Sequence, residues 1–243
     1  MQKFFIDSIP PSETYFRLDG ENFDHLKVLR PKAGDELVLC DGRGTDYFCR
    51  LDSISRHEAL LTVTASLPSV SEPKVNCHIF MAAAKSDKLE HVIQKATELG
   101  AISVTAFVSE RCVSRPDEKD IGKKLVRWQK IAEAAAGQCG RGIIPKIGFL
   151  PSLKEAVDSA LGSRVPILLY ENEELNSLKS ALSKEPFDSV SIISGPEGGF
   201  SPREAEYMIS AGMLSCSLGK RILRCETAPL CALSAILYHS GDI

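Results

Sequence analysis

DSVSIISGPEGGFSPRE, residues 188–204, places a buried strand, a glycine loop and a helix start in direct succession. The apolar run at 188–194 predicts the strand. Ser201 is the expected N-cap of the helix, Pro202 is its first residue, and Glu204 occupies the capping-box position. A strand that passes through a glycine loop into a helix is the repeating step of α/β folds.

The glycine loop GPEGG, residues 195–199, is suited to a ligand. Glycine lets backbone N–H groups approach a ligand closely, and the N-terminus of the following helix favours negative charge. A tight turn that only needs a positive φ explains a single loop of this kind equally well. The loop is neither GxGxxG nor a P-loop with its lysine, so a dinucleotide or a nucleoside triphosphate fits poorly.

A second glycine-bearing loop, LGKRILRCETAP at 218–229, follows shortly afterwards. A short strand at 213–219 precedes it, and an apolar helix follows with Thr227 as the predicted N-cap. Two such loops suit a ligand that lies across the carboxyl ends of parallel strands. Ordinary surface ion pairs explain Arg221 and Arg224 as well when each is taken alone, so the two loops predict a pocket without naming its ligand.

Strands and helices alternate through the whole second part of the chain. Further strands are predicted at 77–84, 102–108 and 165–171, and helices at about 86–99, at about 119–139 and from Ser152 onward. Asp87 and Glu90 have the capping-box spacing for the first of these helices, and Gly100 ends it. Continuously apolar strands between amphipathic helices predict a mostly parallel sheet that is covered on both faces.

The first part of the chain has a different pattern, with short alternating segments that are broken by turn residues. Within 36–54, the turn signal DGRG at 41–44 separates two strand-like runs, and another strand is expected at 60–67. PSVSEPK at 68–74 has no apolar period and predicts a linker. We therefore predict two domains. A small β-rich domain is expected over 1–72 and an α/β domain over 73–243.

The composition is that of an ordinary folded protein, with 44% hydrophobic and 25% charged residues in 243. Eight cysteines occur without a CxxC pair and five histidines without zinc spacing, so we expect reduced thiols and no metal. No apolar run approaches the roughly 18 residues of a membrane span, and the N-terminus does not resemble a secretory signal. A cytoplasmic protein is expected.

The net charge of −3 would count against a polyanionic partner, but the charges are unevenly distributed. Residues 1–72 carry 8 basic and 12 acidic side chains, residues 73–150 carry 13 and 8, and residues 151–243 carry 8 and 12. The middle segment therefore has a net charge of +5 between two segments of −4. A basic helix face is usually just solvated, but beside a catalytic site it becomes a candidate surface for RNA phosphates.

Three further segments join the two glycine loops in a resemblance to a known family. They are KSDKLEHVIQKATELGA at 85–101, SERCVSR at 109–115 and RWQKIAEAAAGQCGRGIIP at 127–145. Together the five segments resemble the RsmE family of small-subunit ribosomal RNA uridine-N3 methyltransferases, which belong to the SPOUT superfamily. The similarity extends from HLKVLR at 25–30 through nearly the whole chain.

The resemblance implies a fold, a cofactor and partners. It implies an N-terminal PUA-like β-barrel followed by an α/β domain with a deep trefoil knot, which general topology rules would not predict because threaded chains are very rare. It also implies S-adenosylmethionine as the cofactor, 16S rRNA or the small ribosomal subunit as the substrate, and a homodimer.

The resemblance also implies site residues, carried over motif by motif. The expected cofactor residues are Leu169, Tyr170, Gly195, Glu197, Gly198, Gly199, Leu218, Gly219, Ile222, Leu223 and Arg224. Glu98 is the expected proton acceptor, although a solvated carboxylate at a helix end explains it equally well. Arg111 is a candidate for contact with the base or with an RNA phosphate, and Arg224 is expected near the reacting base. The residues expected to contact the RNA backbone are Lys123, Lys124, Arg127 and Arg141.

Three alternatives differ from this interpretation. A ribose 2′-O-methyltransferase of the same superfamily would share the cofactor loops. A non-catalytic RNA-binding protein with a PUA barrel is disfavoured because both glycine segments are intact. A nucleotide-binding enzyme of the Rossmann type fits least well.

Overall fold

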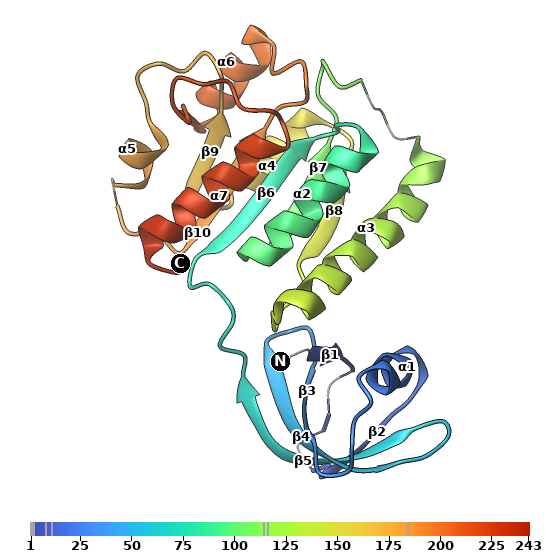
Figure 1. The fold of residues 1–243 in the computed structure, drawn as a ribbon. Coiled ribbons are helices and arrows are strands. Elements are labelled where there is room, and N and C mark those ends of the chain that lie inside the picture. Colours follow the sequence, from blue (N-terminus) through green and yellow to red (C-terminus); the bar gives the residue numbers. More distant parts are fainter. Residues whose placement is uncertain (1–2, 8, 11, 114, 116, 184) are drawn as a thin grey trace. The chain divides into compact units, whose positions relative to one another are not determined.

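The computed structural model describes residues 3–7, 9–10, 12–113, 115, 117–183 and 185–243. The chain forms two compact units, each with its own sheet (Figure 1). The first unit consists of Met1–Glu72 and Ala136–Ile144, and the second of Pro73–Ala135 and Pro145–Ile243. The short segment 136–144, which the sequence analysis assigned to the second domain, is therefore grouped with the first unit.

A five-stranded sheet forms the first unit. Its strands are β1 (Lys3–Phe5), β2 (Tyr15–Leu18), β3 (Glu36–Cys40), β4 (Thr45–Ile54) and β5 (Ala59–Pro68), in the order β1-β3-β4-β5-β2. The predicted turn joins β3 to β4, where the carboxylate of Asp41 accepts hydrogen bonds from the backbone N–H groups of Arg43 and Thr45 at 2.8 and 3.0 Å. Helix α1 (Gly20–Val28) was not predicted, because it buries only Phe23 and Leu26 and so has a weak apolar period.

Glu72, in the stretch predicted as a linker, is bound tightly within this unit. The guanidinium of Arg141 donates to its carboxylate at 3.1 Å through Nε, and the backbone N–H groups of Gly142 and Ile143 donate to it at 2.8 and 3.1 Å. Arg141 is only 3% exposed. Its guanidinium is therefore not available to an RNA phosphate, which corrects the expectation that Arg141 contacts the RNA backbone.

This buried pair predicts a large loss of stability in Arg141→Ala. The variant leaves Glu72 as an unpaired carboxylate in the interior, and we expect the free energy of unfolding to fall by about 3–5 kcal/mol in urea titrations. Arg50→Ala is the matched control, because its partner Asp52 lies 3.5 Å away at the surface and such pairs contribute at most about 1 kcal/mol. A loss no larger than that of Arg50→Ala would contradict the assignment.

The same pair makes stability depend on pH. Burial alone would raise the pKa of Glu72, but the hydrogen bonds and charge of Arg141, with the backbone donors, outweigh burial and hold this pKa below its usual value. A carboxyl whose pKa is lowered by folding contributes its full stability above the pKa of the unfolded chain, and this contribution is lost as the pH falls through the folded pKa. The difference in the free energy of unfolding between wild type and Arg141→Ala should therefore become smaller as the pH falls through the folded pKa of Glu72.

A six-stranded parallel sheet forms the second unit. Its strands are β6 (Asn76–Ala82), β7 (Ser103–Phe107), β8 (Lys146–Leu150), β9 (Val165–Leu169), β10 (Ser189–Ser194) and β11 (Leu214–Cys216), in the order β11-β9-β10-β6-β7-β8. The predicted parallel sheet is confirmed. The sequence analysis missed β8, whose sequence KIGFL interrupts the apolar run with Gly148.

Helices cover both faces of this sheet, as predicted. They are α2 (Ser86–Leu99), α3 (Glu118–Cys139), α4 (Leu153–Ala160), α5 (Leu178–Leu182), α6 (Pro202–Ser210) and α7 (Thr227–Ser240). Figure 1 shows α2 and α7 side by side in front of the sheet, with α4 behind it. Alternate residues of β10 join different cores, since Ile192 packs with the α2 and α7 side and Ile193 with the α4 and α6 side.

The ends of α2 differ in how well they were predicted. Gly100 follows the helix with a φ of +110°, as expected for a left-handed C-cap. Lys85 is the N-cap and makes no side-chain cap bond, so the predicted capping box of Asp87 and Glu90 is wrong, because Asp87 already lies inside the helix.

None of the helices in the described part of the chain has the length and apolar character needed to cross a membrane. The knot stays a prediction.

Candidate functional site

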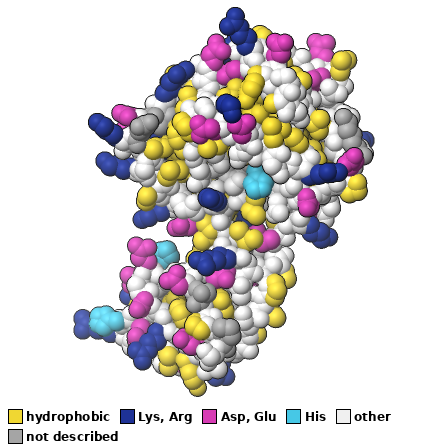
Figure 2. Space-filling model, turned by 180° about the vertical axis from the view of Figure 1, so that it is seen from behind, with side chains coloured by type: hydrophobic (Ala, Val, Ile, Leu, Met, Phe, Trp, Pro, Cys, Tyr) yellow, Lys and Arg dark blue, Asp and Glu magenta, His cyan; other side chains and the backbone are white. Residues whose placement is uncertain are grey.

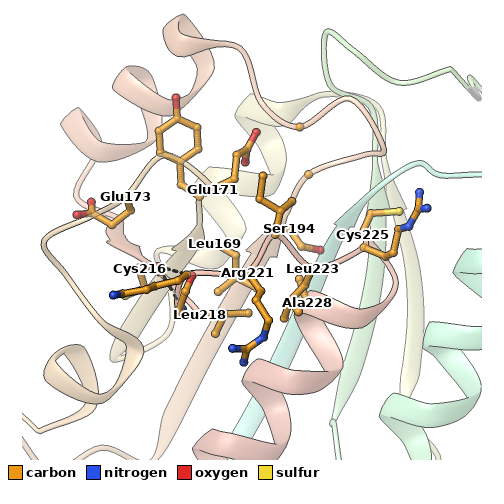
Figure 3. A pocket seen from close by; sticks show the side chains of 18 of the residues that line it. Leu169, Glu171, Glu173, Ser194, Cys216, Leu218, Arg221, Leu223, Cys225 and Ala228 are labelled. Atoms are coloured by element: carbon orange, nitrogen blue, oxygen red, sulfur yellow. Dashed lines mark hydrogen bonds between the residues drawn. The ribbon is translucent and has the colours of Figure 1, made fainter.

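A cavity of about 1070 Å³ opens at the carboxyl ends of three adjacent strands of the parallel sheet. Leu169, Ser194 and Cys216 are the last residues of β9, β10 and β11, and all three line it. Figure 3 shows Leu169, Leu218 and Leu223 gathered at its centre, with the carboxylate of Glu171 above them and that of Glu173 at the left. The pocket thus lies where the two glycine loops predicted it.

The two loops and the end of β9 bring together every residue that the sequence analysis assigned to the cofactor. The cavity is lined by Leu169, Tyr170, Gly195, Glu197, Gly198, Gly199, Leu218, Gly219, Ile222, Leu223 and Arg224. Segments that are far apart in the sequence therefore line one cavity. Further lining residues that the sequence analysis did not single out include Lys88, Glu171, Glu173, Ser194 and Cys225.

The glycine loop needs a glycine at 199. Gly199 has a φ of +64°, and its backbone N–H donates to the carbonyl of Pro196 at 3.0 Å, which closes a tight turn. A Cβ added at this position would overlap Oε1 of Glu171. The exposed carboxylate of Glu171 can turn away from such a Cβ, so the positive φ is the stronger reason for a glycine at 199.

The predicted capping box of α6 is confirmed. The hydroxyl of Ser201 accepts the backbone N–H of Glu204 at 3.3 Å, and the carboxylate of Glu204 accepts the backbone N–H of Ser201 at 2.9 Å. These two hydrogen bonds thus hold the N-terminus of α6 directly after the glycine loop.

The second loop ends differently from the prediction. Glu226, and not Thr227, is the N-cap of α7, and it makes no side-chain cap bond. The backbone N–H groups of Thr227 and Ala228 already donate to the carbonyl of Arg224 at 2.9 and 3.0 Å. The chain therefore turns into the helix before Thr227, which leaves Thr227 as the first helical residue.

Lys88 connects α2 to both pocket loops. Its Nζ lies 3.1 Å from Oε1 of Glu197 in the first loop and 3.6 Å from Oε2 of Glu226 in the second. The hydrogen bond to Glu197 is the largest cause that raises the pKa of Lys88. Lys88 lies within the resembling segment 85–101, but no pattern in the sequence gave it a role.

Two small polar side chains on the pocket wall differ in their partners. Burial, followed by the hydrogen bond to Glu226, raises the pKa of the Cys225 thiol to about 12, so this thiol stays protonated at neutral pH and is no nucleophile. Ser194 is 2% exposed, and its hydroxyl has no hydrogen-bond partner among the residues that the structure describes. A buried hydroxyl without a partner, next to a glycine cradle, fits a pocket that holds a polar ligand.

Glu98 does not reach this pocket, which corrects its expected role as proton acceptor. It lies ten residues beyond Lys88 on α2, a distance of about 15 Å along the helix. Both of its carboxylate oxygens are bound by Nζ of Lys95, at 2.8 and 3.0 Å. The carboxylates that line the pocket are those of Glu171, Glu173, Glu174 and Glu197.

Of the two arginines expected near the reacting base, only Arg224 lines the pocket. Arg111 is exposed and lies behind the glycine loop, where its Nη1 donates to the carbonyls of Gly198 and Phe200 at 3.0 and 3.3 Å. The structure therefore places Arg111 in contact with protein backbone.

The basic residues of α3 are accessible to different degrees. Lys123 is exposed, Lys124 is half-buried, and Arg127 is exposed with its guanidinium 2.7 Å from the carboxylate of Glu90. Figure 2 shows basic and acidic side chains interspersed over one face of the molecule. Contact between these α3 residues and RNA stays a prediction.

Comparisons with known proteins give concordant matches over nearly the whole chain. A family model described as an RNA methyltransferase domain matches residues 71–237, and one described as an RNA methyltransferase PUA domain matches residues 18–64. The chain is 34% identical to the ribosomal RNA small subunit methyltransferase E of Bacillus subtilis, over 99% of this chain and 97% of that protein. The protein of the same name from Mycobacterium tuberculosis is 31% identical, over 96% and 90%.

A solved structure gives the same result. It is a ribosomal RNA small subunit methyltransferase E from Neisseria gonorrhoeae bound to S-adenosyl methionine. It superposes with a TM-score of 0.82 at 28% identity and covers 98% of each chain.

Proposed function

Since the chain belongs to the ribosomal RNA small subunit methyltransferase E family, we propose that it transfers a methyl group from S-adenosylmethionine to N3 of a uridine in 16S rRNA. The observation that carries this proposal is the pocket, which is lined by all the residues assigned to the cofactor from sequence. The relatives are bacterial proteins named for ribosomal RNA, so we propose the cytoplasm as the site of action.

The residues of the pocket suit this cofactor. Backbone groups of the two glycine loops would contact its polar atoms, the side chains of Leu169, Leu218 and Leu223 would pack against its apolar surface, and the hydroxyl of Ser194 would gain a polar neighbour. When bound, S-adenosylmethionine supplies an electrophilic methyl group.

Reaction at N3 of uridine requires an unpaired base and the removal of its imide proton. We assign to Arg224 the stabilisation of the negative charge that then develops on the adjacent carbonyl oxygens, because it is the predicted catalytic residue that lines the pocket. One of the pocket carboxylates, in place of Glu98, would accept the proton.

Incubation of the protein with small ribosomal subunits and methyl-labelled S-adenosylmethionine tests the proposal. We expect the label in one nucleotide of 16S rRNA, recovered as N3-methyluridine after digestion to nucleosides. A label on a ribose 2′ oxygen would instead identify a different methyltransferase reaction. A protein that binds RNA but not S-adenosylmethionine would be the non-catalytic alternative.

RNA binding should depend on the basic face of α3. Lys123→Ala with Lys124→Ala removes two cations, and we expect the slope of log K against log salt to fall by up to about 2 in filter binding to 16S rRNA fragments. Lys154→Ala is the control, because this lysine lies on α4 and pairs with Asp158 at 2.6 Å. A double variant with the wild-type slope would exclude this face from the RNA interface.

We further propose a homodimer that forms through α7. Residues 227–240 contain no Asp, Glu, Lys or Arg, and Cys231, Ala235 and Tyr238 are exposed at helical spacing on one face. An apolar helix face without charge is typical of an interface between subunits.

Ala235→Arg should therefore weaken the dimer by about 100-fold or more, because the interface would bury an unpaired guanidinium. Sedimentation velocity should detect monomer at concentrations where the wild type is a dimer. Ser210→Arg, at the exposed end of α6, is the control. A variant that sediments like the wild-type dimer would show that this face lies outside the interface.

A further inference from the structure

The turn that follows β7 holds the glycine loop from outside the pocket. We name residues 109–112, with the sequence SERC, the SERC turn. The backbone N–H of Glu110 donates to Glu204 at 2.8 Å, and the carboxylate of Glu110 accepts the hydroxyl of Ser201 at 2.8 Å. This turn therefore contacts the helix start at which the glycine loop ends.

Arg111 extends the contact into the loop itself. Its Nη1 donates to the carbonyls of Gly198 and Phe200, at 3.0 and 3.3 Å, which are the two residues on either side of Gly199. A Cβ at Gly198 would lie 3.4 Å from Cβ of Arg111, so the two backbones are close. Nη1 of Arg111 thus orients the carbonyls of Gly198 and Phe200, which lie on either side of Gly199, the residue with the positive φ.

The SERC turn is itself firmly anchored. Ser109 and Cys112 are 4% and 7% exposed, and the backbone N–H of Ser109 donates to Sγ of Cys112 at 3.3 Å. Cys112 belongs to the core cluster that also holds Phe107 and Phe200. A residue carried by this turn can therefore hold a neighbouring segment in place.

The glycine loop needs such support because three of its five residues are glycines, which have the largest backbone freedom to lose. A loop that is already held in its binding conformation loses less entropy when a ligand arrives, and this raises affinity.

We propose that Arg111 is a positioning residue, which fixes the glycine loop in the conformation that accepts the cofactor. The inference rests on the proposed function, since it takes S-adenosylmethionine as the ligand of the loop. It assigns Arg111 to cofactor affinity and removes it from contact with the RNA base or phosphates.

The test compares cofactor affinity with RNA affinity in Arg111→Ala. We expect calorimetry to show S-adenosylmethionine bound about 10- to 100-fold more weakly, as for the loss of charge-assisted hydrogen bonds. The salt slope of RNA binding should equal that of wild type. Arg111→Lys keeps a cationic donor and should recover part of the cofactor affinity.

Two further measurements make the test specific. Arg203→Ala removes the same charge from the exposed start of α6 and should bind S-adenosylmethionine like wild type. Amide hydrogen exchange of residues 195–201 without cofactor should be faster in Arg111→Ala, at an unchanged melting temperature. This readout reports the loop itself and does not require the cofactor.

The outcomes separate the inference from the function on which it rests. Wild-type protein that does not bind S-adenosylmethionine would overturn the proposed function. Wild-type protein that binds it, with an Arg111→Ala variant of equal affinity and equal loop exchange, would overturn the inference alone. If Arg111→Ala lowers the salt slope of RNA binding by about 1 and leaves the cofactor affinity unchanged, Arg111 contacts an RNA phosphate and the inference is wrong.

Discussion

Gly199→Val should bind S-adenosylmethionine at least about 100-fold more weakly than wild type, a loss of roughly 2.7 kcal/mol in binding free energy. Gly199 has a φ of +64°, a conformation that a β-branched residue adopts only under strain. Its Cβ would also overlap Oε1 of Glu171, so this carboxylate at the edge of the pocket must move. Calorimetry with the purified variant measures the effect directly.

The control for this prediction is Gly241→Val. Gly241 has a φ of +75° and ends α7, and a Cβ there meets nothing within 4 Å. The control carries the same kind of backbone strain without disturbing the pocket, so it should be less stable but should keep the wild-type affinity. Equal cofactor affinity in folded Gly199→Val and wild type would remove the glycine loop from the cofactor site.

Arg224→Ala should lower the single-turnover rate of methyl transfer by about 100- to 1000-fold at saturating cofactor. Its exposed side chain is assigned to the charge on the uridine carbonyl oxygens, so the affinity for S-adenosylmethionine should change only a few-fold. Rapid-quench measurements with 16S rRNA in small subunits give the rate. We therefore expect Arg224→Ala to slow the methyl-transfer step itself and not the binding of the cofactor.

Two variants accompany this measurement. Glu98→Gln should react at the wild-type rate, because Glu98 is bound by Lys95 away from the pocket. Arg203→Ala should do the same and controls for the loss of a surface arginine. If Arg224→Ala also transfers methyl groups at the wild-type rate, the charge must be stabilised by another group.

The local signals in the sequence were sufficient for the pocket walls. The strand, the glycine loop and the capping box at 188–204 lie next to one another in the chain, so their geometry follows from short-range rules. Short elements with weak periods, such as α1 and β8, gave no comparable signal. They are stabilised by packing against residues that are distant in the sequence.

The errors at Glu98 and Arg141 have different causes. In a parallel sheet, the helix after β6 begins at the carboxyl edge and returns to the opposite edge, so topology places Lys88 near the pocket and Glu98 away from it. Motif similarity alone did not take this direction into account. Arg141 finds its partner Glu72 through the fold, and no spacing rule connects positions that far apart.

The pairing of β6 with β10 also determines when the second unit can fold during synthesis on the ribosome. β6 is in the middle of the sheet, yet Cys77 pairs with Val190, so the neighbouring strand emerges from the ribosome long after it. Both pocket loops and α7 come later still. The nascent chain therefore cannot complete this core or bind the cofactor until the residues through α7 have been synthesised, and contacts of such long range also slow folding.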